Sequence, residues 1–226
     1  MSDKKTVELY YDVLSPYSWF GFEILERYVS KWKKMDLKLK PVSLGDIMKA
    51  SDNQPPGVNP IKMQYIGKDL MRLAKHTQIP MKIPSNPEEV IFKKGSKSAM
   101  LFVTAVDIDY PEYTEELSRQ FWMRVWSRDE GITEDAHFTQ AAKKAGMKDD
   151  IIKKALKRSK DKDVADRLQA FADEARANGA FGAPTMIVHV NGEKEMLFGS
   201  DRFNILAEML GEKYDGPQNQ LSKNKA

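Results

Sequence analysis

The first apolar stretch of the chain alternates with a period of two. Val7, Leu9 and Tyr11 recur at every second position, and apolar residues also occupy the opposite phase. This pattern predicts a strand that is buried on both faces. Large apolar residues then recur at spacings of three and four over residues 19–32, which predicts a helix, and alternation returns over residues 37–42. The beginning of the chain therefore predicts a β-α-β unit with a right-handed crossover.

The middle of the chain has a different pattern. Residues 43–60 have a centre rich in Pro, Gly and Asn, which predicts a loop with defined turns. Helical spacing then continues to residue 177, with helices predicted over 61–75, 96–109, 113–127, 135–145, 149–157 and 164–177. The short apolar piece at residues 79–83 contains Pro80, which argues against a strand there.

Strand signals return after Asn178-Gly179, which is a helix C-terminal signal. Residues 185–190 are apolar and β-branched, Asn191-Gly192 favours a hairpin turn, and residues 196–198 form the returning strand. A last helix is expected from about Ser200-Asp201 to Gly211. This order predicts an α/β fold in which a thioredoxin-like domain (residues 1–60 and 178–226) is interrupted by an all-helical insertion domain (residues 61–177).

Composition excludes several classes of protein. The 226 residues carry 36 Lys plus Arg against 33 Asp plus Glu, and charges of both signs are mixed over residues 148–167, which argues against a nucleic-acid partner. No apolar run approaches the ~20 residues of a membrane span, and residues 1–6 hold no signal segment. The absence of cysteine excludes a disulfide framework, a thiol nucleophile, a Cys-x-x-Cys redox pair and Cys-ligated metal. His76, His137 and His189 are too scattered for a metal motif.

The sharpest chemical feature lies where the first strand ends and the first helix starts. Ser15 is a good N-cap, and Pro16 falls on the first helical position. Simple capping explains both residues, yet a helix N-terminus also directs N–H groups and partial positive charge towards an anion. Ser15 and Ser18 have the spacing of the catalytic Cys-x-x-Cys of thioredoxin-like enzymes. A serine cannot exchange disulfides, but it can donate a hydrogen bond to the sulfur of another molecule.

Two further segments are candidates for ligand binding. Thioredoxin-like folds place a cis-proline directly before the third strand, so Ala183-Pro184 is expected to be cis, with the Ala183 backbone free to pair with an extended peptide. A trans turn is the alternative. Ser200 and Asp201 suit an amino acid headgroup, because the hydroxyl and backbone N–H can bind a carboxylate and Asp201 can bind an ammonium. Helix capping is the simpler explanation for this pair.

These segments together resemble the kappa class of glutathione transferases, and the resemblance covers nearly the whole chain. The motifs that carry it are Tyr11-Asp12-Val13-Leu14-Ser15-Pro16-Tyr17-Ser18-Trp19, Asn53-Gln54-Pro55-Pro56-Gly57, Trp122-Met123-Arg124-Val125-Trp126-Ser127-Arg128, Ala180-Phe181-Gly182 with Pro184, and Leu197-Phe198-Gly199-Ser200-Asp201-Arg202. The stretch from Trp122 to Arg128 is particularly specific.

The resemblance implies a homodimeric enzyme that conjugates glutathione to electrophiles such as halogenated aromatics, with some peroxide reduction. Glutathione is then a co-substrate, and no prosthetic group or metal is expected. By position, Ser15 is the catalytic hydroxyl. The implied glutathione-binding residues are Ser15, Pro16 and Tyr17 beside the cysteinyl group, Asn53, Ala183 at the cysteinyl backbone, and Ser200 with Asp201 at the γ-glutamyl end. Relatives often have a bulkier residue at the Ala183 position.

The physical chemistry of sulfur agrees with these roles. A free thiol with a pKa of about 8.5 is only a few per cent thiolate at neutral pH, so activation means favouring the ionised form. The Ser15 hydroxyl and the amides of the first helical turn can do this. Tyr17, Trp19 and residues of the helical insertion are candidates for an apolar electrophile pocket, with a core role open for Trp19. Lys62 is a candidate partner for the glycine carboxylate, although a solvated surface lysine is the simpler interpretation.

Two alternatives remain open. A glutathione-dependent isomerase of the hydroxychromene carboxylate type shares the Ser-Pro-Tyr start, and a non-catalytic thioredoxin-like module could use the same cleft for binding alone. Location follows only from the resemblance, which allows the mitochondrial matrix or the peroxisome. Since Asn224-Lys225-Ala226 departs from the peroxisomal Ser-Lys-Leu ending, the mitochondrial matrix is the expectation.

Overall fold

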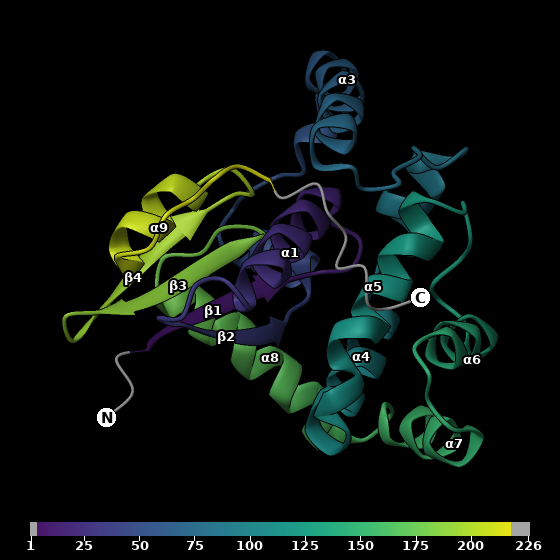
Figure 1. Cartoon of the computed structure of the whole chain (residues 1–226). Coiled ribbons are helices and arrows are strands. Elements are labelled where there is room, and N and C mark those ends of the chain that lie inside the picture. The colour runs from purple at the N-terminus through teal and green to yellow at the C-terminus, as the bar shows by residue number, and fades with distance from the viewer. Residues whose placement is uncertain (1–3, 218–226) are drawn as a thin grey trace.

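The computed structural model describes residues 4–217, so the tripeptide Asn224-Lys225-Ala226 lies outside it. Its four-stranded sheet has the order β2-β1-β3-β4, formed by β1 (Lys5–Tyr11), β2 (Met35–Pro41), β3 (Thr185–Val190) and β4 (Glu193–Phe198). Strand β2 is parallel to β1, whereas β3 is antiparallel to both β1 and β4 (Figure 1). The predicted β-α-β unit and the terminal hairpin are confirmed, and β4 extends further back towards the turn than residues 196–198.

Helices account for most of the remaining chain. They are α1 (Pro16–Val29), α2 (Leu44–Ala50), α3 (Pro60–Thr77), α4 (Lys97–Asp109), α5 (Thr114–Trp126), α6 (Asp135–Lys144), α7 (Asp149–Arg158), α8 (Lys162–Ala177) and α9 (Phe203–Leu210). Short 3₁₀ turns at η1 (Pro56–Val58) and η3 (Pro111–Tyr113) and a π-helical turn at η2 (Glu89–Lys94) complete the list. Residues 61–177 contain helices and no strand, in agreement with the predicted helical insertion.

Two sequence-based predictions are wrong in detail. Residues 43–60 are not loop throughout, because the short helix α2 begins after the Ser43 N-cap and buries Ile47 and Met48. Two turns of helix are too short to show periodicity in the sequence. The last helix begins at Phe203 rather than at Ser200-Asp201, because the N-cap is Arg202 and Phe203 is the first residue of α9 to be buried.

The sheet is covered on both faces, as the first strand predicts. Val7 and Leu9 belong to the larger core cluster, which includes buried residues of α1 and α9. Tyr10 projects to the opposite face, where it clusters with Ile47 of α2 and Phe171 of α8. Helix α8 therefore packs on the sheet although it lies within residues 61–177. The proposed division of the chain at residues 60 and 178 remains a prediction.

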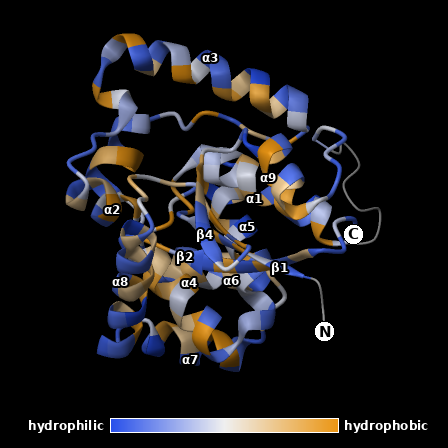
Figure 2. Ribbon diagram, turned by 90° about the vertical axis from the view of Figure 1, so that its left-hand side faces the viewer, coloured by the Kyte–Doolittle hydropathy of each residue, from blue (hydrophilic) through white to orange (hydrophobic). Residues whose placement is uncertain are grey.

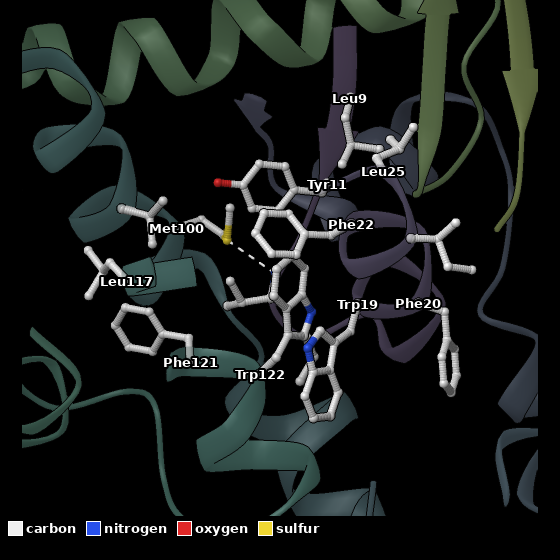
Figure 3. Close-up of a cluster of buried hydrophobic side chains, with 14 of the residues drawn as sticks. Leu9, Tyr11, Trp19, Phe20, Phe22, Leu25, Met100, Leu117, Phe121 and Trp122 are labelled. Carbon is white, nitrogen blue, oxygen red and sulfur yellow. Dashed lines mark hydrogen bonds between the residues drawn. The ribbon is translucent and has the colours of Figure 1, made fainter. Parts of the chain in front are cut away.

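Figure 1 shows α4 to α7 beside the sheet and α3 standing apart from both. The large core nevertheless runs from the sheet into the helical part (Figure 3). The ring of Trp122 from α5 lies 5.3 Å from that of Tyr11 in β1 and 4.8 Å from that of Phe22 in α1, measured between centroids. None of the helices in residues 4–217 has the length and apolar character needed to cross a membrane.

Candidate functional site

A cleft of about 760 Å³ opens at the N-terminal end of α1. The structure brings together in its lining the seven glutathione-binding residues that the resemblance implied, namely Ser15, Pro16, Tyr17, Asn53, Ala183, Ser200 and Asp201. These residues come from four separate segments of the chain. Their convergence follows from the fold, because the ends of β1, β3 and β4 meet the loop after β2 at one edge of the molecule.

Ser15 is buried at the floor of the cleft, with only 4% of its surface exposed. As predicted, it is the N-cap of α1: its Oγ accepts a hydrogen bond from the Ser18 N–H at 3.1 Å. The same hydroxyl donates to the carbonyl oxygen of Ala183 at 3.2 Å. Ser18 is fully buried, does not line the cleft, and its own hydroxyl has no partner. Only one serine of the Ser15-x-x-Ser18 pair therefore faces the cleft.

The Ala183-Pro184 peptide bond is cis, which confirms the prediction from the fold. Pro184 is buried, and its carbonyl accepts a hydrogen bond from the Gly199 N–H at 3.0 Å. This bond ties the segment before β3 to the segment after β4. Ala183 is consequently held opposite Ser15, and its backbone lies at the surface of the cleft.

Tyr17 forms part of the wall through its ring. Its hydroxyl donates to Asp69 Oδ2 on α3 at 2.8 Å. Burial, and then the hydrogen bond with the Asp69 carboxylate, raise the pKa of Tyr17 well above its usual value. The phenol therefore stays protonated at physiological pH, and its proton is directed to α3. In this geometry Tyr17 contributes an aromatic surface and a link between α1 and α3.

The opposite rim carries the predicted headgroup residues. Asn53 Nδ2 donates to the Phe181 carbonyl at 2.8 Å, and the Phe181 ring packs on Phe198 with centroids 4.3 Å apart. Ser200 is half-buried, whereas Asp201 is exposed and lies 3.5 Å from the Arg202 guanidinium. Asn53 thus holds the loop that presents Ala183, while Asp201 remains accessible from the cleft.

A predominantly apolar wall faces these polar groups. It is supplied by α3 and η2, through Met63, Tyr65, Ile66, Leu70, Leu73, Ile91 and Phe92. Figure 2 shows hydrophobic positions interspersed with polar ones along α3, which spans the top of the molecule in that view. Trp19 does not take part, because it is buried in the core and its Nε1 donates to Glu23 at 3.1 Å. Trp126 lines the cleft instead, a role that the sequence analysis missed.

The cations in the lining differ from the one expected. Lys62 is exposed on α3 and is not among the lining residues, whereas Lys94 and Lys97 are. Lys97 Nζ lies 2.9 Å from Asp46 Oδ2, so that ammonium is already paired. Lys94 has a more distant partner in Glu89, at 3.9 Å. The two lysines flank the pair Gly95-Ser96, in a polar stretch whose sequence gives no signal of a cleft.

Asp12 lies directly beneath the site and is completely buried. Its carboxylate accepts hydrogen bonds from the Leu14 N–H, the Leu44 N–H and the Ser96 hydroxyl, each at 2.8 Å. Burial raises the pKa of Asp12, and these three donors oppose the rise. All three partners act as donors, an arrangement that satisfies the ionised carboxylate. The only signal in the sequence was an acidic residue directly after the first strand.

No group of three or more potential metal ligands occurs within residues 4–217. His137, one of the three scattered histidines, accepts backbone hydrogen bonds from Thr133 and Glu134 through Nδ1, both at 3.2 Å. Burial and the nearby Arg124 guanidinium lower the pKa of His137. This histidine therefore has a structural role at the start of α6.

Comparison with known proteins gives consistent matches. A family model described as a DSBA-like thioredoxin domain matches residues 6–211. The chain is 48% identical over 213 residues to glutathione S-transferase kappa 1 of Homo sapiens and 47% identical to that of Rattus norvegicus, with 94% of each chain covered in both comparisons. Among solved structures, 2-hydroxychromene-2-carboxylate isomerase superposes with a TM-score of 0.73 at 20% identity, covering 91% of this chain and 94% of the isomerase. At that identity the likeness concerns the fold.

Proposed function

Because the chain belongs to the DSBA-like thioredoxin family and, within it, to the kappa class of glutathione transferases, we propose that Ser15 activates the glutathione thiol for attack on small electrophiles. The observation that carries the proposal is the position of the Ser15 hydroxyl. It lies at the start of α1, at the floor of the cleft, and within hydrogen-bond distance of the Ala183 carbonyl.

That hydrogen bond suggests how glutathione engages the hydroxyl. The Ser15 hydroxyl directs its proton to the Ala183 carbonyl. We propose that the cysteinyl N–H of glutathione takes over this carbonyl as its acceptor. The Ser15 hydroxyl is then free to turn and donate to the sulfur, while its oxygen continues to cap α1 through the Ser18 N–H. Binding of the peptide backbone thereby makes the donor available to the thiolate.

The thiolate is favoured by three groups of this chain. The Ser15 hydroxyl donates to it, the Tyr17 N–H in the first turn of α1 has no acceptor within the helix, and the helix N-terminus adds partial positive charge. A lowering of the thiol pKa by about two units corresponds to roughly 2.7 kcal/mol. No general base is required on the enzyme, because the thiol proton passes to solvent water as glutathione binds. The ionised sulfur is the nucleophile.

The apolar wall suits the second substrate. Halogenated aromatics can bind against α3 and η2 in reach of the sulfur, where the cleft supplies proximity and orientation. Attack forms a carbon–sulfur bond, and the halide leaves with the bonding electrons. The same thiolate can attack a hydroperoxide: a sulfur–oxygen bond forms, the O–O bond breaks, and the alcohol leaves after taking up a proton. The resulting glutathione sulfenic acid condenses with a second glutathione to give glutathione disulfide and water. We also propose a homodimer, which light scattering tests against the monomer mass of 25.8 kDa.

The test is the absorbance of the bound thiolate, titrated against pH, together with conjugation of a chloronitroaromatic acceptor. Ser15→Ala should raise the pKa of the bound thiol towards about 8.5 and abolish most conjugation while glutathione still binds. Ser15→Thr keeps both the hydroxyl and the cap, so it should retain a lowered pKa. Ser18→Ala is the matched control, because that buried hydroxyl has no partner and does not reach the cleft.

Other outcomes point to the alternatives. Glutathione that binds with an unshifted thiol pKa and undergoes no conjugation indicates a binding module, and refutes the role of Ser15. Turnover of a chromene carboxylate without consumption of glutathione indicates an isomerase, in which the thiolate adds to the substrate and leaves again.

A further inference from the structure

The helical part of the chain reaches the floor of the cleft through two indoles of α5. Trp122 Nε1 donates a hydrogen bond to the carbonyl of Ser15 at 3.0 Å, and Trp126 Nε1 donates to the carbonyl of Leu14 at 3.2 Å. The two tryptophans are four residues apart, so they lie on one face of the helix. Both are buried, with 0% and 2% of their surfaces exposed. Two consecutive backbone carbonyls are thus bound by two consecutive turns of α5.

The amides of the same two residues are bound as well. The Leu14 N–H donates to the Asp12 carboxylate at 2.8 Å, and the Ser15 N–H donates to the Asp12 carbonyl at 3.0 Å. Every backbone donor and acceptor of Leu14 and Ser15 therefore has a partner on the core side. The side chain of Ser15 is the polar group of this segment that remains available to a ligand.

The packing around Trp122 makes this arrangement rigid. Its ring lies against Tyr11 and Phe22, the latter from the first part of α1 that follows Ser15 (Figure 3). A buried indole N–H that lost its carbonyl would be left without a partner, which is unfavourable. The position of α5 is consequently coupled to the position of the Ser15 peptide.

We propose that Trp122 and Trp126 are positioning residues that hold the Leu14-Ser15 segment in the geometry needed to stabilise the glutathione thiolate. The proposal rests on the proposed role of Ser15. Trp122 does not line the cleft, so it acts through the Ser15 carbonyl, whereas the Trp126 ring is also part of the lining. The helical insertion is then part of the catalytic apparatus in addition to forming the wall for the electrophile.

Trp122→Phe removes the N–H donor and keeps an aromatic ring. The protein contains a matched control in Trp19, which is equally buried in the same cluster but whose indole Nε1 donates to Glu23 and not to the cleft floor (Figure 3). The backbone N–H of residue 19 donates to the Ser15 carbonyl at 3.2 Å, and Trp19→Phe keeps that N–H. The variant therefore creates a comparable packing defect without removing a donor from the Leu14 or Ser15 carbonyl. Trp126→Phe provides a second variant should Trp122→Phe fold poorly.

The assay measures the pKa of the bound thiol and the pH dependence of conjugation, at a temperature where circular dichroism shows all variants folded. Trp122→Phe should raise the bound-thiol pKa by about one unit, since a misaligned Ser15 donates less well. At pH values below the wild-type thiol pKa, the variant should also have a kcat about tenfold lower than wild type. This difference in kcat should become smaller at higher pH, where the thiol is ionised in both proteins. KM for glutathione should change little, and Trp19→Phe should leave both the pKa and the pH profile unchanged.

The proposal is overturned if Trp122→Phe and Trp126→Phe match Trp19→Phe in thiol pKa and pH profile. Equal losses of activity in all three variants, at unchanged thiol pKa, would also overturn it, because they would reflect packing alone. Ser15→Ala separates this failure from that of the proposed function. A raised thiol pKa in Ser15→Ala with no shift in the tryptophan variants contradicts the positioning role only, whereas no shift in Ser15→Ala contradicts the role of Ser15 itself.

Discussion

Replacement of Asp12 by alanine should be among the most destabilising single changes near the cleft. The carboxylate accepts hydrogen bonds from two backbone amides and one hydroxyl, which come from the residues just before α1, the first residue of α2 and the residue just before α4. Asp12→Ala leaves three donors without their acceptor. Each buried, unsatisfied donor costs about 1–3 kcal/mol, and loss of the buried charge offsets part of the sum. We therefore expect the free energy of unfolding to fall by about 3 kcal/mol.

Two further variants disturb only part of the hydrogen bonding of Asp12 and should lower the free energy of unfolding by less. Ser96→Ala removes one donor and leaves the carboxylate with the Leu14 and Leu44 amides, so it should cost about 1 kcal/mol. Asp12→Asn keeps the shape, but its NH₂ group must face at least one of the two amide N–H groups, so its cost should be intermediate. Ser98→Ala is a control, because Ser98 has only a long contact with the Thr133 carbonyl, at 3.5 Å.

Urea unfolding followed by circular dichroism measures these differences. With a slope of about 3 kcal/mol per molar urea, a loss of 3 kcal/mol lowers the midpoint by about 1 M. The reasoning is refuted if Asp12→Ala loses less than about 1 kcal/mol, or if Ser96→Ala is as damaging as Asp12→Ala. Either result would mean that water or backbone movement satisfies the donors when the carboxylate is absent.

Three other changes have defined outcomes. Tyr17→Phe removes the 2.8 Å hydrogen bond to Asp69, so thermal unfolding should show that the free energy of unfolding falls by about 1 kcal/mol. The pKa of the bound thiol should stay unchanged, and a raised thiol pKa would assign the phenol a chemical role. Gly199 has a φ of 97°, and a Cβ there would lie 3.0 Å from Asp201 Oδ1. Gly199→Ala should therefore lower the free energy of unfolding by roughly 1–2 kcal/mol and weaken glutathione binding measured by calorimetry. Wild-type affinity for glutathione would contradict this. The pKa of His137 is lower in the folded protein than the unfolded value of about 6.5, so the unfolded state binds the proton more readily. The free energy of unfolding should therefore fall as the pH drops through about 6.5. His137→Gln should flatten this part of the stability profile in urea titrations at several pH values, and an unchanged slope would show that another group is responsible.

Local patterns sufficed for the features that depend on neighbouring residues. The N-cap at Ser15, the helices of the insertion and the hairpin at Asn191-Gly192 all follow from spacing and capping rules that act within a few positions. The start of α9 was misplaced because Ser200 and Asp201 are as good N-caps as any, and the burial of Phe203 decides the boundary.

Features that depend on distant contacts could not be predicted in the same way. The spacing of Trp122 and Trp126 indicates a shared helix face, but nothing in the sequence shows that this face meets Leu14 and Ser15, more than a hundred positions earlier. The three partners of Asp12 are likewise distributed along the chain. The cis-proline could be predicted because the order of helices and strands indicated a thioredoxin-like fold. The roles of Ser200 and Asp201 at the γ-glutamyl end were carried over from the family resemblance and stay predictions.

The hydrogen bonds between α5 and the cleft floor have a consequence for how the protein is made. Ser15 leaves the ribosome early, the indoles of Trp122 and Trp126 follow much later, and Ala183 comes last. A nascent chain that ends before Trp122 has the serine but lacks both the donors that anchor its peptide and the carbonyl opposite its hydroxyl. The complete cleft floor should therefore form only when the C-terminal hairpin has left the ribosome, and on the proposed role of Ser15 incomplete chains do not activate the thiol of glutathione.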